Sequence, residues 1–593
     1  MTILGGNSPL HLLVSPDRPL TPDGPLRPVL VDPRSSEALA ARGWQHVGHE
    51  QERTTRTPLT GVPRTDPVIG TFDRASGLER LTGQTFDVLV IGGGITGAGV
   101  LLDAVSRGLS AALIEKHDFA SGTSSKSSKL VHGGLRYLQH GEIGLVREAL
   151  AERTILMGMA PHLVRVMPFM IPMFSRDGVI NPRISRALGL ALWQYDLAGG
   201  LRIGRAHRRL DHSATLAMVP ALRGERVGAS YLYFDAQADD ARLTLEVIRT
   251  AALDFGAVAV NHCRPVSLLH DPSGLVAGAE VMADDGRFTV RARTVVNATG
   301  VWADDIGELD AGTRSRTVRP AKGVHVTVPR ERLPTEVAVV VPVRGDRRSV
   351  FVVPWGDFVY VGTTDTDYRG PLEDPTCDDD DVSYLLDAVN AATTADLTPT
   401  DVTGTWAGLR PLVDRGDAGN SRTADLSRRH LVDVSPSGMV TVTGGKLTTF
   451  RRMAADAVDR CVEQLPASVA GRSRTRRLRL IGARGHGDHA LTGLPPGAAD
   501  HLRRRYGGQA RTIAAIVSAD PGLGAPLVEG LPYLRAEAAF GFRHEMAVTT
   551  DDILARRTRA RLLDAEAAAR AEEGVADLAR KLVGQGPFSP SAD

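Results

Sequence analysis

The clearest local pattern in the chain is a short run of consecutive apolar residues, FDVLVI at 86–91. Such a run predicts a parallel strand that is buried on both faces. Glycines follow it, and from Ile95 to Arg107 the apolar positions recur at helical spacing until Gly108. A second apolar run, AALIE at 111–115, predicts another buried strand. We therefore expect a compact βαβ unit here.

The middle of the chain, from about 165 to 440, alternates short strand-like runs with turns. Two turns have the residues typical of hairpins, Asp285-Gly286 and Pro436-Ser437-Gly438. These patterns predict a mixed or antiparallel sheet. The helices expected to interrupt it lie near 145–160, 187–197 and 239–255.

The two ends of the chain have different patterns. Residues 1–80 are predicted to be a disordered extension, because ten prolines lie among polar residues up to about residue 68 without a regular period. Apolar positions three and four residues apart from Leu447 to Leu465 predict the last helix of the main domain. Residues 466–500, rich in Arg, Gly and Pro, are predicted to be a linker, whose basic stretch at 472–479 is either solvated or in contact with anionic lipid.

A small all-helical domain is expected at 501–593. Its helical segments are predicted near 498–518, 531–547 and 550–582. Thr549 and Asp552 have the spacing of a capping box at the start of the third segment.

Composition narrows the class of protein. The 593 residues exceed what one core usually serves, so several domains are expected. The 70 Lys and Arg residues nearly balance the 69 Asp and Glu residues, so the net charge gives no reason to expect a nucleic-acid partner. The three cysteines, Cys263, Cys377 and Cys461, exclude a disulfide framework and a CxxC pair. Without a signal-like start or a long apolar run, the chain is expected to be cytoplasmic, with any membrane contact peripheral.

The glycines after the first strand fit a dinucleotide site. Gly92, Gly94 and Gly97 form G-x-G-x-x-G, and Glu115 ends the next strand, where it can accept hydrogen bonds from a ribose. NAD and the ADP half of FAD use the same unit. A later buried strand ending in Ala298-Thr299-Gly300 resembles the late strand that returns to the cofactor in two-domain flavoproteins of the glutathione-reductase-like type, which favours FAD. The hydroxyl-rich segment SGTSSKSSK at 121–129 fits this choice, because its side chains can bond a ribityl chain or a pyrophosphate.

Several longer segments resemble FAD-dependent glycerol-3-phosphate dehydrogenases. The resemblance covers residues 84–460 closely and the C-terminal region more loosely. It is carried by SSKLVHGGLRYLQHGEIGLVREALAER (127–153), VNATGVWADD (296–305), KGVHVTVP (322–329), FVVPWGDFVYVGTTDTDY (351–368), GLRPLVD (408–414) and GGKLTTFRRMA (444–454).

The resemblance implies an α/β fold of the glutathione-reductase-like type. An FAD-binding domain is interleaved with a substrate domain of mixed or antiparallel sheet within 81–465, ahead of the helical C-terminal domain. The FAD-binding parts are expected at about 84–165, 230–310 and 405–465, and the substrate parts at 166–230 and 311–404.

The resemblance also implies a substrate site for sn-glycerol 3-phosphate. His325, Arg410 and Lys446 are the expected catalytic residues, and His325 lies on the strand face opposite Val324 and Val326. His325 is the candidate either to accept the proton of the substrate hydroxyl or to bind that hydroxyl, and guanidinium groups bind phosphate in a fixed orientation. The residues expected to bind substrate are Arg136, Tyr137, Arg410, Arg428 and Asp365.

The cofactor site implied by the resemblance involves three further segments. Gly445 and Lys446 precede the last helix of the main domain, whose N-terminus would stabilise the negative charge of reduced flavin. Besides the residues of the glycine motif, the residues expected to bind FAD are Thr123, Ser124, Ser128, Lys129, Leu130, Ala298, Thr299, Gly300, Gly445, Lys446, Leu447 and Thr448. No metal site is expected, because His544-Glu545 lacks a second histidine at 548.

We therefore expect an enzyme that forms dihydroxyacetone phosphate and passes electrons to a membrane quinone, peripherally attached to the inner face of the cell membrane. A homodimer is also considered. Three alternatives stay open: an oxidase relative that uses oxygen, a regulatory dinucleotide-binding protein without turnover, and an NAD-dependent dehydrogenase, which the late Ala-Thr-Gly strand disfavours.

Overall fold

The computed structural model describes most of the chain after residue 71. The described residues are 13–14, 45–46, 72–135, 142–174, 182–283, 286–313, 317–345, 348–413, 430–466, 470–485 and 491–582, without the side chains of 13–14, 45–46 and 182–184. The chain divides into two compact units, residues 1–67 and 68–593. In the first, β1 (Leu13–Val14) pairs antiparallel with β2 (Gln45–His46). The remainder of the expected extension, up to residue 71, lies outside the described residues.

The predicted βαβ unit is confirmed. It consists of β3 (Thr85–Ile91), α3 (Ile95–Ser106) and β4 (Ala111–Ile114), and the two strands are parallel. The late strand, β12 (Gly286–Asn297), pairs in parallel with the other side of β3, Val296 opposite Val90. The Ala298-Thr299-Gly300 turn therefore follows directly beside the glycine motif.

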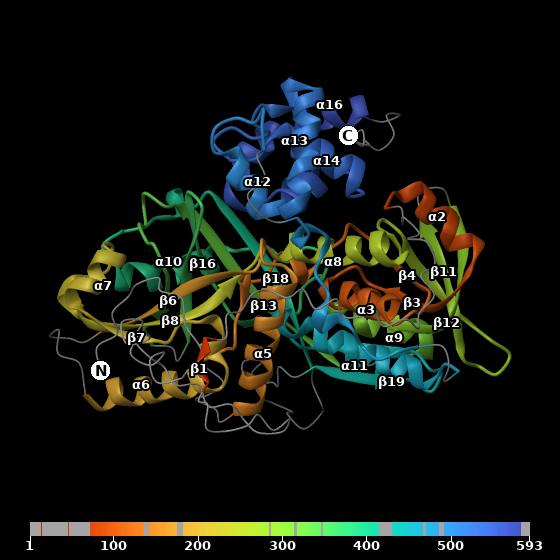
Figure 1. Cartoon of the computed structure of the whole chain (residues 1–593), viewed down its shortest axis with the longest axis horizontal. Coiled ribbons are helices and arrows are strands. Elements are labelled where there is room, and N and C mark those ends of the chain that lie inside the picture. Colours follow the sequence, from red (N-terminus) through yellow and green to blue (C-terminus); the bar gives the residue numbers. More distant parts are fainter. Residues whose placement is uncertain are drawn as a thin grey trace. The chain divides into compact units, whose positions relative to one another are not determined.

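These strands belong to an eight-stranded sheet whose main path runs β10-β11-β12-β3-β4-β9. The antiparallel hairpin of β19 and β20 joins it where β20 pairs with β12. The other strands of this sheet are β9 (Val258–Val260), β10 (Arg264–His270), β11 (Val276–Ala283), β19 (Leu431–Val434) and β20 (Val440–Thr443). Helices α3, α8 (Asp240–Phe255) and α11 (Phe450–Glu463) pack together on this sheet (Figure 1).

The second large sheet has ten strands and contains both parallel and antiparallel pairs. Its main path runs β17-β13-β16-β15-β14-β6-β8-β5, while β18 pairs with β13 and β7 with β8. Its strands are β5 (Leu130–Val131), β6 (Arg165–Phe174), β7 (Arg208–Asp211), β8 (Val227–Gln237), β13 (Val318–Pro329), β14 (Ala338–Pro342), β15 (Ser349–Trp355), β16 (Phe358–Gly362), β17 (Thr366–Asp367) and β18 (Gly404–Val413).

Three strands differ from the expected division. β5 and most of β8 fall in segments assigned to the FAD-binding part, but they belong to the second sheet. β18 lies in the segment assigned to the FAD-binding part, yet it pairs with β13 over its whole length in the second sheet. Alternation along a strand shows which side chains are buried, but it does not show which sheet the strand joins.

Besides α3, the main domain has eight described helices; the periodicity predicts those at 143–159, 182–197, 240–255 and 450–463 but not the other four. The eight helices are α2 (Arg74–Gly83), α5 (Ile143–Met159), α6 (Pro182–Leu197), α7 (His212–Met218), α8 (Asp240–Phe255), α9 (Ala303–Ala311), α10 (Asp379–Ala392) and α11 (Phe450–Glu463). The extension is expected to reach residue 80, but α2 begins at Arg74 and Phe72 before it is buried in the core, so ordered structure begins earlier.

The C-terminal domain is helical, as predicted, but its helices are shorter. They are α12 (Ala498–Tyr506), α13 (Ala510–Ala519), α14 (Arg535–His544), α15 (Ala560–Leu563) and α16 (Ala565–Leu582), with a π-helical stretch at Asp552–Arg557 (Figure 1). The predicted capping box is present, since Thr549 N donates to Asp552 and Asp552 N to the Thr549 hydroxyl.

The segment expected to be a linker is partly packed. Leu480 is fully buried in the core of the FAD-binding sheet, and the Thr475 hydroxyl lies 3.1 Å from Asp103. The five arginines at 472, 474, 476, 477 and 479 are exposed.

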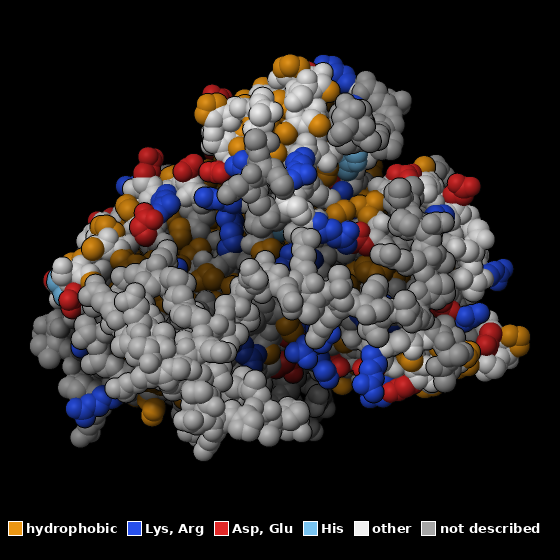
Figure 2. Space-filling model, in the orientation of Figure 1, with side chains coloured by type: hydrophobic (Ala, Val, Ile, Leu, Met, Phe, Trp, Pro, Cys, Tyr) orange, Lys and Arg blue, Asp and Glu red, His pale blue; other side chains and the backbone are white. Residues whose placement is uncertain are grey.

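Charges of both signs are interspersed over the face drawn in Figure 2, in keeping with the net charge of +1. Among the described helices, none combines the length and the apolar character needed to cross a bilayer.

Candidate active site

A cavity of about 550 Å³ is lined by residues from both sheets. One part is formed by the glycine motif, Glu115 and the 121–128 segment, and another by His325 and Arg410. Residues 444–448 complete it. The cavity thus brings together most of the described residues that the sequence analysis selected.

The glycine motif is built for close backbone approach. Gly92 has φ +111°, and a Cβ on it would lie 2.7 Å from the Ala298 carbonyl oxygen. A Cβ on Gly97 would lie 1.9 Å from the carbonyl oxygen of Gly92, so Gly97 serves the packing of α3 and does not line the cavity. Gly94 precedes α3 and faces the cavity, where the positive end of the helix dipole can bind a pyrophosphate.

Glu115 is held by backbone donors. Its carboxylate accepts a hydrogen bond of 2.6 Å from Gly93 N and one of 2.9 Å from His117 N. Burial raises the pKa of Glu115, although these two N–H groups oppose the shift. The Glu115 side chain is therefore fixed at the cavity wall, where the glycine motif predicts that a ribose hydroxyl of the cofactor binds.

The hydroxyl-rich segment contributes both to the cavity and to its support. Thr123, Ser124, Ser128 and Leu130 line the cavity. The Ser124 hydroxyl accepts from Ile95 N at 2.8 Å, which ties the segment to the start of α3.

Lys129 differs from the expectation that it binds the cofactor. Its ammonium group lies 3.4 Å from Asp240 and 4.5 Å from the centre of the Trp406 ring, and it does not line the cavity. Burial, followed by the neighbouring charge of Arg559, lowers the pKa of Lys129 to about 7.

Residues 444–448 line the cavity and lead into the helix that was expected to start here. Gly445 has φ +78°, and Lys446 precedes a short 3₁₀ turn, Leu447–Thr449, that continues into α11. The Thr448 hydroxyl accepts from His132 N at 3.1 Å. Ala298, Thr299 and Gly300 line the cavity as well.

His325 is almost completely buried, with 2% of its surface exposed. Its Nε2 lies 2.9 Å from the Ser128 hydroxyl, and its ring stacks on Trp406 at 4.7 Å. Burial, with the charges of Lys129 and Arg410, holds the pKa of His325 well below 6.5, so the ring is neutral at pH 7. Within the described residues no group is in hydrogen-bond range of its Nδ1.

Arg410 lies on β18 and lines the cavity. Its guanidinium donates to Asp365 at 2.9 Å and to the Thr363 hydroxyl at 3.2 Å. Asp365 itself does not line the cavity, so its observed role is to orient Arg410. The other expected substrate-binding residues, Arg136, Tyr137 and Arg428, lie outside the described residues.

Two site residues were missed by the sequence analysis. Trp406 stacks on His325, and its position four residues before Arg410 on the same strand face was an available signal. Asp240, in the first turn of α8, accepts from the Ser127 backbone and hydroxyl at 3.0 and 2.7 Å. Nothing in the local pattern distinguishes it from an ordinary acidic residue at a helix start.

Two family models match the chain. Residues 87–451 match the family described as FAD dependent oxidoreductase, and residues 473–586 match the C-terminal domain of alpha-glycerophosphate oxidase.

Curated relatives match most of the chain. Glycerol-3-phosphate dehydrogenase 2 of Mycobacterium tuberculosis is 43% identical over 502 residues, which are 83% of this chain and 84% of that protein. A mitochondrial glycerol-3-phosphate dehydrogenase of Arabidopsis thaliana is 35% identical over 92% of this chain and 89% of its own length.

A solved structure is also similar. The glycerol-3-phosphate dehydrogenase of Bacillus halodurans, complexed with FAD, superposes with a TM-score of 0.69 at 30% identity and covers 86% of this chain and 93% of that one.

Proposed function

Because the chain belongs to the FAD-dependent oxidoreductases, and among them to the glycerol-3-phosphate dehydrogenases, we propose that it oxidises carbon 2 of sn-glycerol 3-phosphate to give dihydroxyacetone phosphate. The observation that carries the proposal is a buried, neutral histidine beside an oriented arginine on the wall of the cofactor cavity. These two groups match the two demands of the substrate, removal of a hydroxyl proton and binding of a phosphate.

The cavity fits FAD, since the cradle around Gly92 and Gly97 leaves no space for a side chain and the α3 N–H groups face it. Gly94, Glu115 and the 121–128 segment would hold the adenine-side half, and residues 444–448 the flavin. When bound, FAD supplies the acceptor for the two electrons and the hydrogen that leave carbon 2.

His325 takes the hydroxyl proton in this proposal. A neutral imidazole has a free lone pair at pH 7, and the Ser128 hydroxyl and the Trp406 ring fix its orientation. Arg410, oriented by Asp365, binds the phosphate and so places the hydroxyl at the histidine. Lys446 and the helix start after it offset negative charge at the flavin end of the cavity.

We propose a membrane quinone as the electron acceptor, which requires contact with the bilayer. Helix α6 supplies a suitable surface: Leu190, Trp193 and Leu197 recur on one helical face and are 62%, 55% and 72% exposed. Arg186 and Arg202, both exposed, flank this row. An apolar helix face bordered by arginine is the combination that binds an anionic lipid surface without spanning it.

The acceptor is tested by supplying two acceptors in turn to the purified enzyme with sn-glycerol 3-phosphate. A dehydrogenase reduces a soluble quinone analogue and forms little hydrogen peroxide in air. Stoichiometric peroxide with no reduction of the quinone analogue would favour the oxidase alternative. Absence of turnover with either acceptor would favour the regulatory one.

A further inference from the structure

The segment from Glu115 to Leu130 lines much of the cofactor cavity and has a strained backbone. Ala120 and Lys129 adopt φ values of +63° and +56°, which side chains other than glycine rarely adopt. Such conformations persist only where the surrounding structure enforces them. The contacts that hold this segment therefore determine whether the cavity keeps its shape.

One set of contacts comes from the C-terminal domain and reaches Asp118. Arg557 forms a forked pair with both carboxylate oxygens of Asp118, at 2.5 and 2.8 Å, and is 1% exposed. Arg556 adds a third bond to Asp118 at 2.6 Å. Asp118 follows Glu115 by three residues, so these arginines fix the turn that presents the ribose-binding carboxylate.

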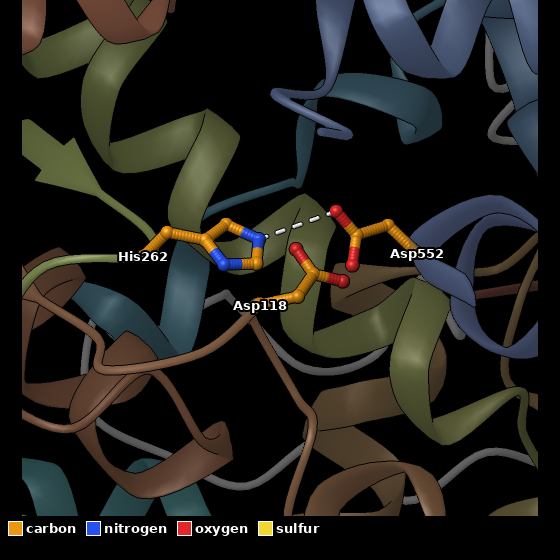
Figure 3. A group of neighbouring side chains, drawn as sticks. All are labelled: Asp118, His262 and Asp552. Atoms are coloured by element: carbon orange, nitrogen blue, oxygen red, sulfur yellow. Dashed lines mark hydrogen bonds and ion pairs between the residues drawn. The ribbon is translucent and has the colours of Figure 1, made fainter. Parts of the chain in front are cut away.

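Asp118 also lies beside His262 and Asp552, and Figure 3 shows the three side chains pointing toward one another. Their ligand atoms lie within 4.8 Å of one another, a spacing that a metal ion could use. Arg556 bonds to both carboxylates, however, at 2.6 Å to Asp118 and 2.7 Å to Asp552. Because arginine already neutralises both acids, we assign the group to the ion-pair network between the domains.

A second set of contacts reaches the other end of the segment. Arg559 donates at 2.6 Å to the Ser125 carbonyl oxygen and at 2.6 Å to Asp240. Asp240 in turn accepts from the backbone and hydroxyl of Ser127. Ser127 precedes Ser128, and the Ser128 hydroxyl is hydrogen-bonded to His325. This series of contacts therefore connects Arg559 to the part of the cavity wall that His325 forms.

We propose that Arg556, Arg557 and Arg559 are positioning residues that hold the Glu115–Leu130 segment in the shape that binds FAD. None of the three lines the cavity. Docking of the C-terminal domain and retention of the cofactor are then coupled, and the coupling is reciprocal. The proposal rests on the FAD-binding family of the chain and not on the identity of its electron acceptor.

The first test measures release of FAD from the diluted holoenzyme by its fluorescence. Arg557→Met and Arg559→Met should each raise the dissociation constant for FAD by about tenfold, within the usual range of coupling between sites. Arg570→Met is the matched control, because Arg570 pairs with Glu566 within α16 of its own domain. Ile513→Val, in the core of the C-terminal domain, controls for a general loss of stability.

Wild-type affinity in both arginine variants would overturn the proposal, as would equal loss of FAD in the Ile513→Val control. A second test needs no variant and so stands even if the variants fail to fold. Binding of FAD to flavin-depleted wild-type protein should slow hydrogen exchange of amides in residues 550–563, which do not line the cavity. Unchanged exchange there would contradict the coupling.

Discussion

His325 combines three influences on one imidazole ring: burial, two neighbouring positive charges and an aromatic partner. Replacement by asparagine keeps polarity and approximate size but removes the basic nitrogen. Loss of a general base typically slows the step about 10²- to 10⁴-fold, so flavin reduction in His325→Asn should slow to that degree while substrate affinity changes little.

Stopped-flow absorbance under anaerobic conditions measures this rate. His270→Asn is a control, since His270 pairs with Asp310 at the surface and lies away from the cavity. If His325→Asn bleached at the wild-type rate, the proton acceptor would have to be another group.

The lowered pKa of His325 has a consequence for pH dependence. In the unfolded chain the group gains a proton as the pH falls through about 6.5, whereas in the folded protein it remains neutral. The rate of flavin reduction should therefore show no decline with a midpoint near 6.5. Below about pH 6.5 the unfolded chain binds a proton at His325 and the folded protein does not. The contribution of His325 to the free energy of unfolding therefore falls as the pH falls below about 6.5.

Arg410 offers a test of phosphate recognition. A charge-assisted hydrogen bond contributes about 1.5–3 kcal/mol, so Arg410→Ala should lower kcat/KM for sn-glycerol 3-phosphate about ten- to a hundredfold. Arg319→Ala is the control, because Arg319 of β13 pairs with Asp367 of β17 and does not line the cavity. An unchanged kcat/KM in Arg410→Ala would refute the assignment.

The position of an individual residue could be predicted where a motif specified both the residue type and its place in the fold. The glycines, Glu115, His325 and Arg410 all lie where the motifs put them, at or against one cavity. Lys129 was expected at the cofactor, but its ammonium group lies beside Asp240, a residue 111 positions away in sequence. A charge pair between such distant residues has no local signal, so sequence reasoning assigns the lysine to the nearest motif.

At the scale of elements, the turn between β3 and α3 is the strongest link between sequence and function. A Cβ on Gly94 would lie 3.1 Å from the Ser124 hydroxyl, on the cavity side of the turn. Gly94→Val should therefore give a folded protein without the yellow flavin absorbance. Gly307→Ala, in α9 with nothing within 4 Å of the new Cβ, should retain FAD. Stoichiometric flavin in purified Gly94→Val would contradict the assignment.

Elements with a strong period were predicted well, and those held by distant contacts were not. α3, α5 and α8 match the expected helices closely. α2 was missed because it contains only two leucines, Leu78 and Leu81, and its burial depends on the first sheet. The long third helix of the C-terminal domain is broken at 552–559, where three arginines turn toward the main domain.

At the scale of the whole molecule, the mixed surface charge makes the row of exposed apolar residues on α6 distinctive. Trp193→Ser with Leu197→Ser should lower the fraction of protein bound to vesicles containing phosphatidylglycerol, because both side chains leave water on binding. Leu275→Ser, which removes a 49% exposed leucine elsewhere, is the control. Equal vesicle binding by the α6 variant and the wild type would show that this surface does not bind the membrane. A change of oligomeric state in the variant would instead indicate that α6 contacts a second copy of the chain.

A cavity that holds FAD next to a bound phosphate-bearing alcohol should let that alcohol reduce the flavin. The most direct measurement is the visible absorbance spectrum of the purified protein under anaerobic conditions, before and after addition of sn-glycerol 3-phosphate. We expect an oxidised flavin spectrum that bleaches on this addition and stays unchanged with the same concentration of glycerol. A flavin that sn-glycerol 3-phosphate does not bleach, or that glycerol bleaches equally well, would contradict it.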